Sequence, residues 1–122
     1  MKESRPLYKR KRYLLFALIV IGIIYVGYSI VAPGSHDELA KCLGEKGATM
    51  YGAYWCPHCN NQKAAFGKSF QFINYVECSQ QEALCEQMNV TGLPTWIIGG
   101  RHLEGEQTFE TLAEAAGCDL SS

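Results

Sequence analysis

The sequence predicts an α/β domain with a mixed four-stranded sheet and helices on both faces, preceded by one transmembrane helix. Short apolar, β-prone stretches alternate with stretches of helical periodicity. This order favours a strand–helix–strand unit with parallel pairing and a right-handed crossover. Near the C-terminus the dipeptide Gly99-Gly100 separates two further β-prone stretches and indicates a hairpin, which adds an antiparallel edge. The 122 residues suggest a single domain.

The first part of the chain has the composition of a single-pass signal anchor. Residues 1–12 carry six Lys/Arg and one Glu, whereas residues 13–32 carry no charge. Such a segment spans about 30 Å as a helix, enough to cross a bilayer. The basic flank predicts a cytoplasmic tail and an exported C-terminal domain, located in the periplasm, at the cell exterior or, for a plastid-related protein, in the thylakoid lumen. A cleaved signal peptide is the alternative, because Gly27 and Ser29 fit a small-residue cleavage pattern.

Charge and cysteine content both point to an exported domain. Residues 33–122 hold five Lys/Arg and eleven Asp/Glu, which argues against a nucleic-acid partner. All six cysteines lie in this part of the chain, and an even number in a small exported domain indicates disulfides. If Cys56 pairs with Cys59, three pairings remain open for the other four cysteines.

A capping pattern opens the domain, which is predicted over residues 36–118 after a short linker at residues 33–35. Ser35 and Glu38 occupy the N-cap and N3 positions of a helix. The apolar periodicity of this helix predicts that it buries Leu39, Cys42 and Leu43.

An uncharged strand over residues 48–54 and a helix over residues 60–70 form the next unit. Gly67 inside this helix marks a candidate bend. The predicted buried face of the helix holds Ala65, Phe66 and Phe70.

The second half of the domain repeats the alternation of strand and helix. A strand over residues 73–78 leads to a second capping pattern at Ser79 and Glu82, which opens a helix through about residue 88. Strands over residues 93–98 and 101–105 flank the hairpin. Thr108 caps a last helix over residues 109–116, and Gly117 ends it.

Cys56 and Cys59 stand where the first strand ends and the following helix begins. Unpaired N–H groups and about half a positive charge at a helix N-terminus favour thiolate over thiol. Cys56 is therefore the expected nucleophile and Cys59 the resolving thiol. Pro57 fits the first helical turn, and His58 can add positive charge or a hydrogen-bond donor near the sulfurs.

Two other readings of these cysteines compete with redox exchange. A structural disulfide is disfavoured because a short pair at a helix mouth is strained and exposed, as labile disulfides are. Zinc usually requires two closely spaced pairs, so no metal site is assigned, although His58 beside the cysteines could help to hold Cu(I) in a metallochaperone. The metal content of the purified protein would separate these classes.

The pattern around the cysteines resembles the thioredoxin fold, with a strand-opening proline some 35 residues after the pair. More narrowly, residues 36–118 are similar to the thioredoxin-like domain that accompanies bacterial and plant homologues of vitamin K epoxide reductase (VKOR). The residues that carry this resemblance are Met50 to Cys59, Gln62-Lys63, Phe66-Gly67, Tyr75 to Cys78 and Leu93 to Trp96.

This resemblance implies a protein thiol-disulfide oxidoreductase that needs no cofactor. Its Cys56–Cys59 disulfide would pass to cysteines of exported proteins, as in the oxidising Cys-Pro-His-Cys enzymes of the bacterial periplasm. A separate VKOR-type, quinone-linked membrane enzyme would re-oxidise it, because this chain has one predicted span rather than a fused four-helix portion. Thioredoxin buries an acid on the strand before its cysteines, and residues 48–55 offer none. The alternative is a reductase or isomerase, for example of apocytochromes.

The resemblance also implies roles for residues outside the pair. Pro94 would be cis and face the cysteines, exposing the backbone of Leu93 to an incoming peptide. Trp55, beside the sulfurs, has either a core or a substrate role, whereas Trp96 is expected in the core. The family pattern favours a structural Cys78–Cys85 bridge, which leaves Cys42 and Cys118 to pair by elimination, or to remain free.

Overall fold

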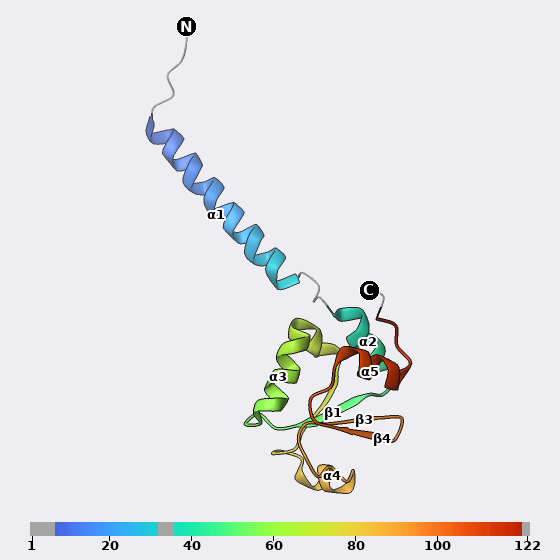
Figure 1. Cartoon of the computed structure of the whole chain (residues 1–122). Helices are drawn as coiled ribbons and strands as arrows, with labels where there is room; N and C mark the ends of the chain where they lie inside the picture. The colour runs from blue at the N-terminus through green and yellow to red at the C-terminus, as the bar shows by residue number, and fades with distance from the viewer. Residues whose placement is uncertain (1–6, 32–35, 121–122) are drawn as a thin grey trace. The chain divides into compact units, whose positions relative to one another are not determined.

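The computed structural model describes residues 7–31 and 36–120, which belong to two compact units divided between residues 32 and 33 (Figure 1). The first unit holds helix α1 (Leu7–Val31). Its segment Tyr8–Ile30 is long and apolar enough to cross a membrane, a test that a signal sequence near the N-terminus also passes. The helix begins before residue 13 because Lys and Arg are good helix formers, so residues 9–12 join it. The predicted linker and Ser35 cap lie outside the described residues.

The second unit is built on the predicted mixed four-stranded sheet, with strands in the order β2-β1-β3-β4. Strand β1 (Thr49–Gly52) pairs in parallel with β2 (Asn74–Glu77) and antiparallel with β3 (Thr95–Ile98). Strand β4 (Arg101–Glu104) completes the hairpin with β3. The turn between them needs glycine, because Gly99 and Gly100 both have positive φ angles, of 56° and 79°.

Helices cover both faces of this sheet (Figure 1). One face packs against α2 (Asp37–Glu45), α3 (Pro57–Phe66) and α5 (Phe109–Ala116), and the other packs against the short α4 (Glu82–Gln87). Strand alternation sorts the side chains between the two layers. The larger cluster contains Met50, Phe66 and Trp96, and the smaller contains Tyr51, Cys85 and Ile97.

The last helix follows its predicted boundaries. Thr108 is its N-cap, and the Thr108 hydroxyl accepts a hydrogen bond from the Thr111 N–H. Gly117 ends the helix in the left-handed conformation, with φ of 70°, as glycine readily does. Leu112 and Ala113 are buried from this helix.

The start of α4 and the buried face of α3 differ from prediction. His36 is the N-cap residue of α2, and its ring packs against that of Phe109 in a tilted arrangement, with the ring centroids 4.3 Å apart. Helix α4 starts at Glu82 without a side-chain cap, because the Ser79 hydroxyl donates instead to Glu77. Ala65 is exposed, so its assignment to the buried face of α3 was wrong. That face instead presents Cys59, Gln62 and Phe66.

Helix α3 changes character at Gly67, where a bend was predicted. Gly67 has a φ of +56°, and the chain continues as a 3₁₀ helix, η1 (Gly67–Phe72). The tighter turn redirects the chain, so that Ser69 becomes fully buried and donates a hydrogen bond to Asp37 at 2.8 Å. This bond ties η1 to the start of α2.

The structure contains the disulfide that the resemblance implied and the second one that elimination left. Cys42 of α2 is bonded to Cys118, which follows α5, over a sequence separation of 76 residues. Cys78 is bonded to Cys85 of α4 over a separation of 7 residues. The peptide bond between Leu93 and Pro94 is cis.

Gly44 lies where α2 crosses η1, and we expect Gly44→Ala to destabilise the domain. A methyl group at this position would collide with the backbone carbonyl oxygen of Phe72, which cannot rotate away as a side chain could. Overpacking of this kind costs about 1–3 kcal/mol. Urea unfolding of the variant would measure it, with Gly92→Ala as the control, because a methyl group there meets nothing within 4 Å. A Gly44→Ala midpoint at or above that of the wild type would contradict the packing.

Candidate active site

Cys56 is the N-cap residue of α3, at the mouth of the helix. Its backbone is extended, with φ of −82° and ψ of 116°, and Pro57 occupies the first helical turn. The backbone N–H of Cys59 donates to Cys56 Sγ at 3.2 Å, so the sulfur takes the place that a capping oxygen usually fills. The helix N-terminus therefore directs one of its unpaired backbone N–H groups at this sulfur.

The two cysteines, which are not bonded to each other here, differ in accessibility. Cys56 keeps 4% of its surface exposed, whereas Cys59 keeps none. Burial and, to a smaller extent, the hydrogen bond with the Cys56 side chain raise the pKa of Cys59 to about 12. Cys59 is therefore held as a thiol.

Aromatic side chains flank the pair in two different environments. Tyr54 and Trp55 are 69% and 63% exposed, so Trp55 is open to a partner and is not a core residue. Trp96 is fully buried, as predicted, and its Nε1 donates to Gln62 Oε1 at 3.4 Å. Two exposed rings directly before Cys56 give the site an apolar rim.

Pro94 is fully buried at the start of β3, and its carbonyl oxygen accepts a hydrogen bond from the Gly105 N–H at 2.7 Å. Leu93 is half-buried and packs against the cluster that contains Cys56 and Cys59. The structure therefore brings the proline segment and the cysteines into one layer of the core, although they lie far apart in the sequence.

His58 is paired with an acid that the sequence did not single out. Its Nδ1 lies 2.7 Å from Glu106 Oε1, and the two side chains form an ion pair when the ring is protonated. Hydrogen bonds from His58 and Asn61 hold the pKa of Glu106 below its usual value. The carboxylate therefore offsets the positive charge that His58 was predicted to bring to the sulfurs.

Gln62 connects α3 to the segment that carries Glu106. Its Oε1 accepts from the Gln107 N–H at 2.7 Å, and its Nε2 donates to the Gln107 carbonyl oxygen at 3.2 Å. Gln62 is 3% exposed, so these bonds satisfy a polar side chain inside the core. A glutamine gives no periodic apolar signal, and its role was not predicted.

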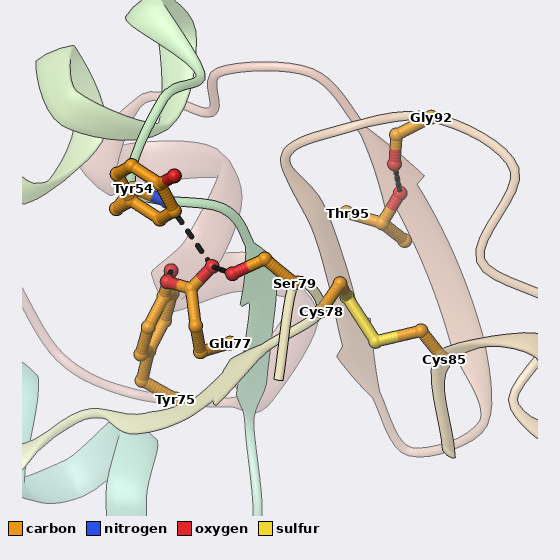
Figure 2. Close-up of a disulfide and its surroundings, with 8 residues drawn as sticks. All are labelled: Tyr54, Tyr75, Glu77, Cys78, Ser79, Cys85, Gly92 and Thr95. Atoms are coloured by element: carbon orange, nitrogen blue, oxygen red, sulfur yellow. Dashed lines mark hydrogen bonds between the residues drawn. A yellow bond between two sulfur atoms is a disulfide. The ribbon is translucent and has the colours of Figure 1, made fainter. Parts of the chain in front are cut away.

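A second acid, Glu77 at the end of β2, accepts several hydrogen bonds, one of them from the segment that precedes Cys56 (Figure 2). Its carboxylate accepts from the Tyr54 N–H at 3.1 Å and from the hydroxyls of Tyr75 and Ser79, both at 2.6 Å. Burial alone would raise the pKa of Glu77, but the bonds from Ser79, Tyr75 and Tyr54 outweigh it and hold this pKa below its usual value. The Tyr75 hydroxyl shows the opposite shift, because burial and the neighbouring carboxylate raise its pKa.

The lowered pKa of Glu77 predicts a pH-dependent stability. A carboxylate with a depressed folded-state pKa stabilises the fold above its unfolded pKa, and this contribution is lost as the pH falls through the folded value. We therefore expect Glu77→Gln to unfold at lower denaturant concentration than the wild type at pH 7, with the difference shrinking toward pH 3. Denaturant unfolding at both pH values would measure this. A difference that persists unchanged at pH 3 would assign the effect to packing.

Within residues 7–31 and 36–120, three or more His, Cys, Asp or Glu side chains do not gather in a way that could hold a metal ion. His36 and His102 have local partners instead. His102 Nε2 lies 2.8 Å from the Met88 carbonyl oxygen, so this side chain links β4 to the end of α4.

The sheet order and the cysteine pair at the helix mouth define a thioredoxin-like domain with a Cys-x-x-Cys site. The chain is 42% identical over 91 residues to "Thiol-disulfide oxidoreductase LTO1" of Arabidopsis thaliana, covering 67% of this chain and 24% of that protein. It is 28% identical over 128 residues to "Protein disulfide isomerase-like 2-2" of Oryza sativa subsp. japonica, covering 86% and 34%. The chain thus spans about a quarter to a third of these relatives.

A crystal structure of oxidized glutaredoxin 2 from Chlamydomonas reinhardtii matches 66% of this chain and 91% of its own, with 23% identity and a TM-score of 0.41. No protein-family model matches the sequence. The names of the two relatives support the predicted class, a thiol-disulfide oxidoreductase.

Proposed function

We propose that this chain is a membrane-tethered thiol-disulfide oxidoreductase that passes a Cys56–Cys59 disulfide to cysteines of exported proteins. The observation that carries the proposal is the asymmetry of the pair. Cys56 Sγ caps α3 and accepts the Cys59 N–H at 3.2 Å, while the Cys59 side chain is fully buried. One sulfur can therefore be attacked from outside, and the other can be released inside the protein.

The transfer follows from this arrangement. A substrate thiolate attacks Cys56 Sγ, the Cys56–Cys59 bond breaks, and Cys59 leaves with the electron pair. A second substrate thiolate then attacks the substrate sulfur of the mixed disulfide, and Cys56 leaves as a thiolate that the helix N-terminus stabilises. The substrate is oxidised by two electrons and the pair is reduced. The exposed rings of Tyr54 and Trp55 supply apolar contact area for a substrate segment.

Renewal of the disulfide requires an oxidant, and a separate quinone-linked membrane enzyme of the VKOR type fills this role in the proposal. The apolar helix α1 would hold the domain at the membrane surface, where such an enzyme lies. Lys9 to Arg12 at the start of α1 favour a cytoplasmic N-terminus and an extracytoplasmic domain. Protease protection of the domain in sealed vesicles would test this orientation.

A reductase or isomerase is the second candidate, and Glu106 favours it. The Glu106 carboxylate, 2.7 Å from His58, adds negative charge near the helix mouth and lowers the advantage of a Cys56 thiolate. Strongly oxidising couples are those in which the reduced form is stabilised. The Cys56–Cys59 potential therefore separates the candidates.

The decisive experiment equilibrates the full chain in detergent with glutathione buffers and follows the state of the pair by thiol trapping. A potential near that of strong oxidants, about −120 mV, supports disulfide donation, whereas one near thioredoxin, about −270 mV, supports reduction. Oxidation of a reduced, unfolded protein by the oxidised chain would complete the test. A chain that cannot oxidise such a substrate would contradict the proposed direction.

A further inference from the structure

The buried position of Cys59 raises the question of where its proton goes. When Cys59 attacks a mixed disulfide at Cys56, it must lose a proton, and in disulfide donation it must regain one. Its side chain is fully buried, and burial raises its pKa to about 12. Strand β1, which precedes the pair, carries no acid. A polar side chain that borders the same space as the sulfur comes instead from the neighbouring strand β2.

Gly52 opens a small space that Cys59 and Tyr75 both border. A methyl group at Gly52 would lie 3.1 Å from Cys59 Sγ and 3.3 Å from the Tyr75 hydroxyl oxygen. The Cys59 sulfur and the Tyr75 hydroxyl therefore both border the position where Gly52 lacks a side chain. A larger residue at position 52 would lie between them. The same hydroxyl donates to Glu77 Oε2 at 2.6 Å, and Glu77 lies directly opposite Gly52 in the pairing of β1 with β2.

We propose that Tyr75 and Glu77 form a proton relay that serves the buried Cys59 thiol. The inference rests on the disulfide exchange proposed above and assigns two further residues to it. The Tyr75 hydroxyl is the inner group, which borders the same space at Gly52 as the sulfur, and the partly exposed Glu77 carboxylate connects it to the solvent side.

The relay balances in both directions. During resolution the Cys59 proton passes to the Tyr75 oxygen as the Tyr75 proton passes to Glu77 Oε2, from which it leaves to water. The Cys59 sulfur then bonds to Cys56 Sγ, and the bond between Cys56 and the partner sulfur breaks, releasing the partner as a thiolate. During donation Cys59 leaves as a thiolate and takes a proton from the Tyr75 hydroxyl. Tyr75 regains a proton from Glu77, and Glu77 takes one from water.

Other charged and titratable groups also face this relay. Lys63 of α3 places its Nζ 3.8 Å from the centre of the Tyr75 ring, and Cys56 lies beside Cys59. Phe70 packs edge-on against Tyr75 at 5.7 Å. A phenylalanine at position 75 keeps both ring contacts and removes only the hydroxyl. Tyr75→Phe therefore tests the proton path without removing the side chain that packs here.

The experiment uses the full chain in detergent, with the Cys56–Cys59 pair reduced and the other two disulfides intact, as a count of two thiols per chain verifies. Stopped-flow mixing with one equivalent of the aromatic disulfide of 5-thio-2-nitrobenzoate gives two absorbance steps. The first reports attack by Cys56, and the second reports resolution by Cys59. We expect Tyr75→Phe and Glu77→Gln to slow the second step about tenfold or more at pH 7, leaving the first unchanged.

The pH profile separates a relay from a structural role. Without the relay, the second step should depend on hydroxide and rise steadily with pH, while the wild-type step is less steep. Tyr51→Phe is the matched control, because Tyr51 lies on the other face of the sheet and should keep both rates. A wild-type second step in Tyr75→Phe, or equal slowing of both steps, would overturn the relay. If the wild-type chain showed no first absorbance step, the proposed disulfide exchange would be overturned, and the relay with it.

Discussion

Cys56→Ser is expected to reduce exchange to the background rate, whereas Cys59→Ser should keep the first attack and accumulate mixed disulfides. The reason is the unequal exposure of the pair, 4% for Cys56 and none for Cys59. Removal of the outer sulfur eliminates the atom that a partner can reach. Removal of the inner sulfur eliminates only the group that resolves the intermediate. Non-reducing electrophoresis and mass spectrometry of chains incubated with a disulfide-containing partner would measure both outcomes.

The control for these variants keeps both active-site cysteines and removes a distant disulfide. A chain with Cys78→Ala and Cys85→Ala should still exchange disulfides wherever it is folded, because that bridge joins the end of β2 to α4. If Cys56→Ser retained exchange while Cys59→Ser lost it without trapping a partner, the assignment of nucleophile and resolving thiol would be reversed.

Local sequence signals predicted the elements that depend on neighbouring residues. Thr108 and Gly117 set the limits of α5 through a cap and a left-handed residue, both of which are local features. The Gly99-Gly100 turn likewise fixed the β3–β4 hairpin. The cap predicted at Ser79 failed because another local acceptor, only two residues earlier in the chain, competed for its hydroxyl. That hydroxyl donates to Glu77, and α4 begins without a side-chain cap.

The core of the candidate site was predictable, but its polar surroundings were not. The position of Cys56 and Cys59 at a helix mouth follows from a strand–helix boundary in the sequence. Glu106 contacts His58 across 48 positions of the sequence, and Gln62 contacts Gln107 across 45. Neither contact belongs to a periodic pattern. Tyr75 was placed in a strand and among the residues that carry the resemblance, without a role of its own. Its place beside Cys59 depends on the register of β1 with β2 and on the missing side chain of Gly52.

Removal of the Cys42–Cys118 disulfide by alanine at both positions should destabilise the domain by about 4 kcal/mol, whereas removal of Cys78–Cys85 should cost about 2 kcal/mol in the chain-entropy account. The difference arises because the first bridge closes a separation of 76 residues in the unfolded chain and the second closes only 7. The first also joins α2 to the end of α5, two helices that cover one face of the sheet.

Thermal unfolding of the two double variants, followed by near-ultraviolet circular dichroism, would measure this ranking. For a domain of this size the Cys42–Cys118 variant should melt at least about 15 °C below the wild type. Equal losses in the two variants would show that native contacts, rather than loop closure, set the contribution of each bridge. In that case the loss for Cys78–Cys85 would exceed the value expected from loop closure. The burial of Cys85, which is 6% exposed in the smaller core cluster, would account for this excess.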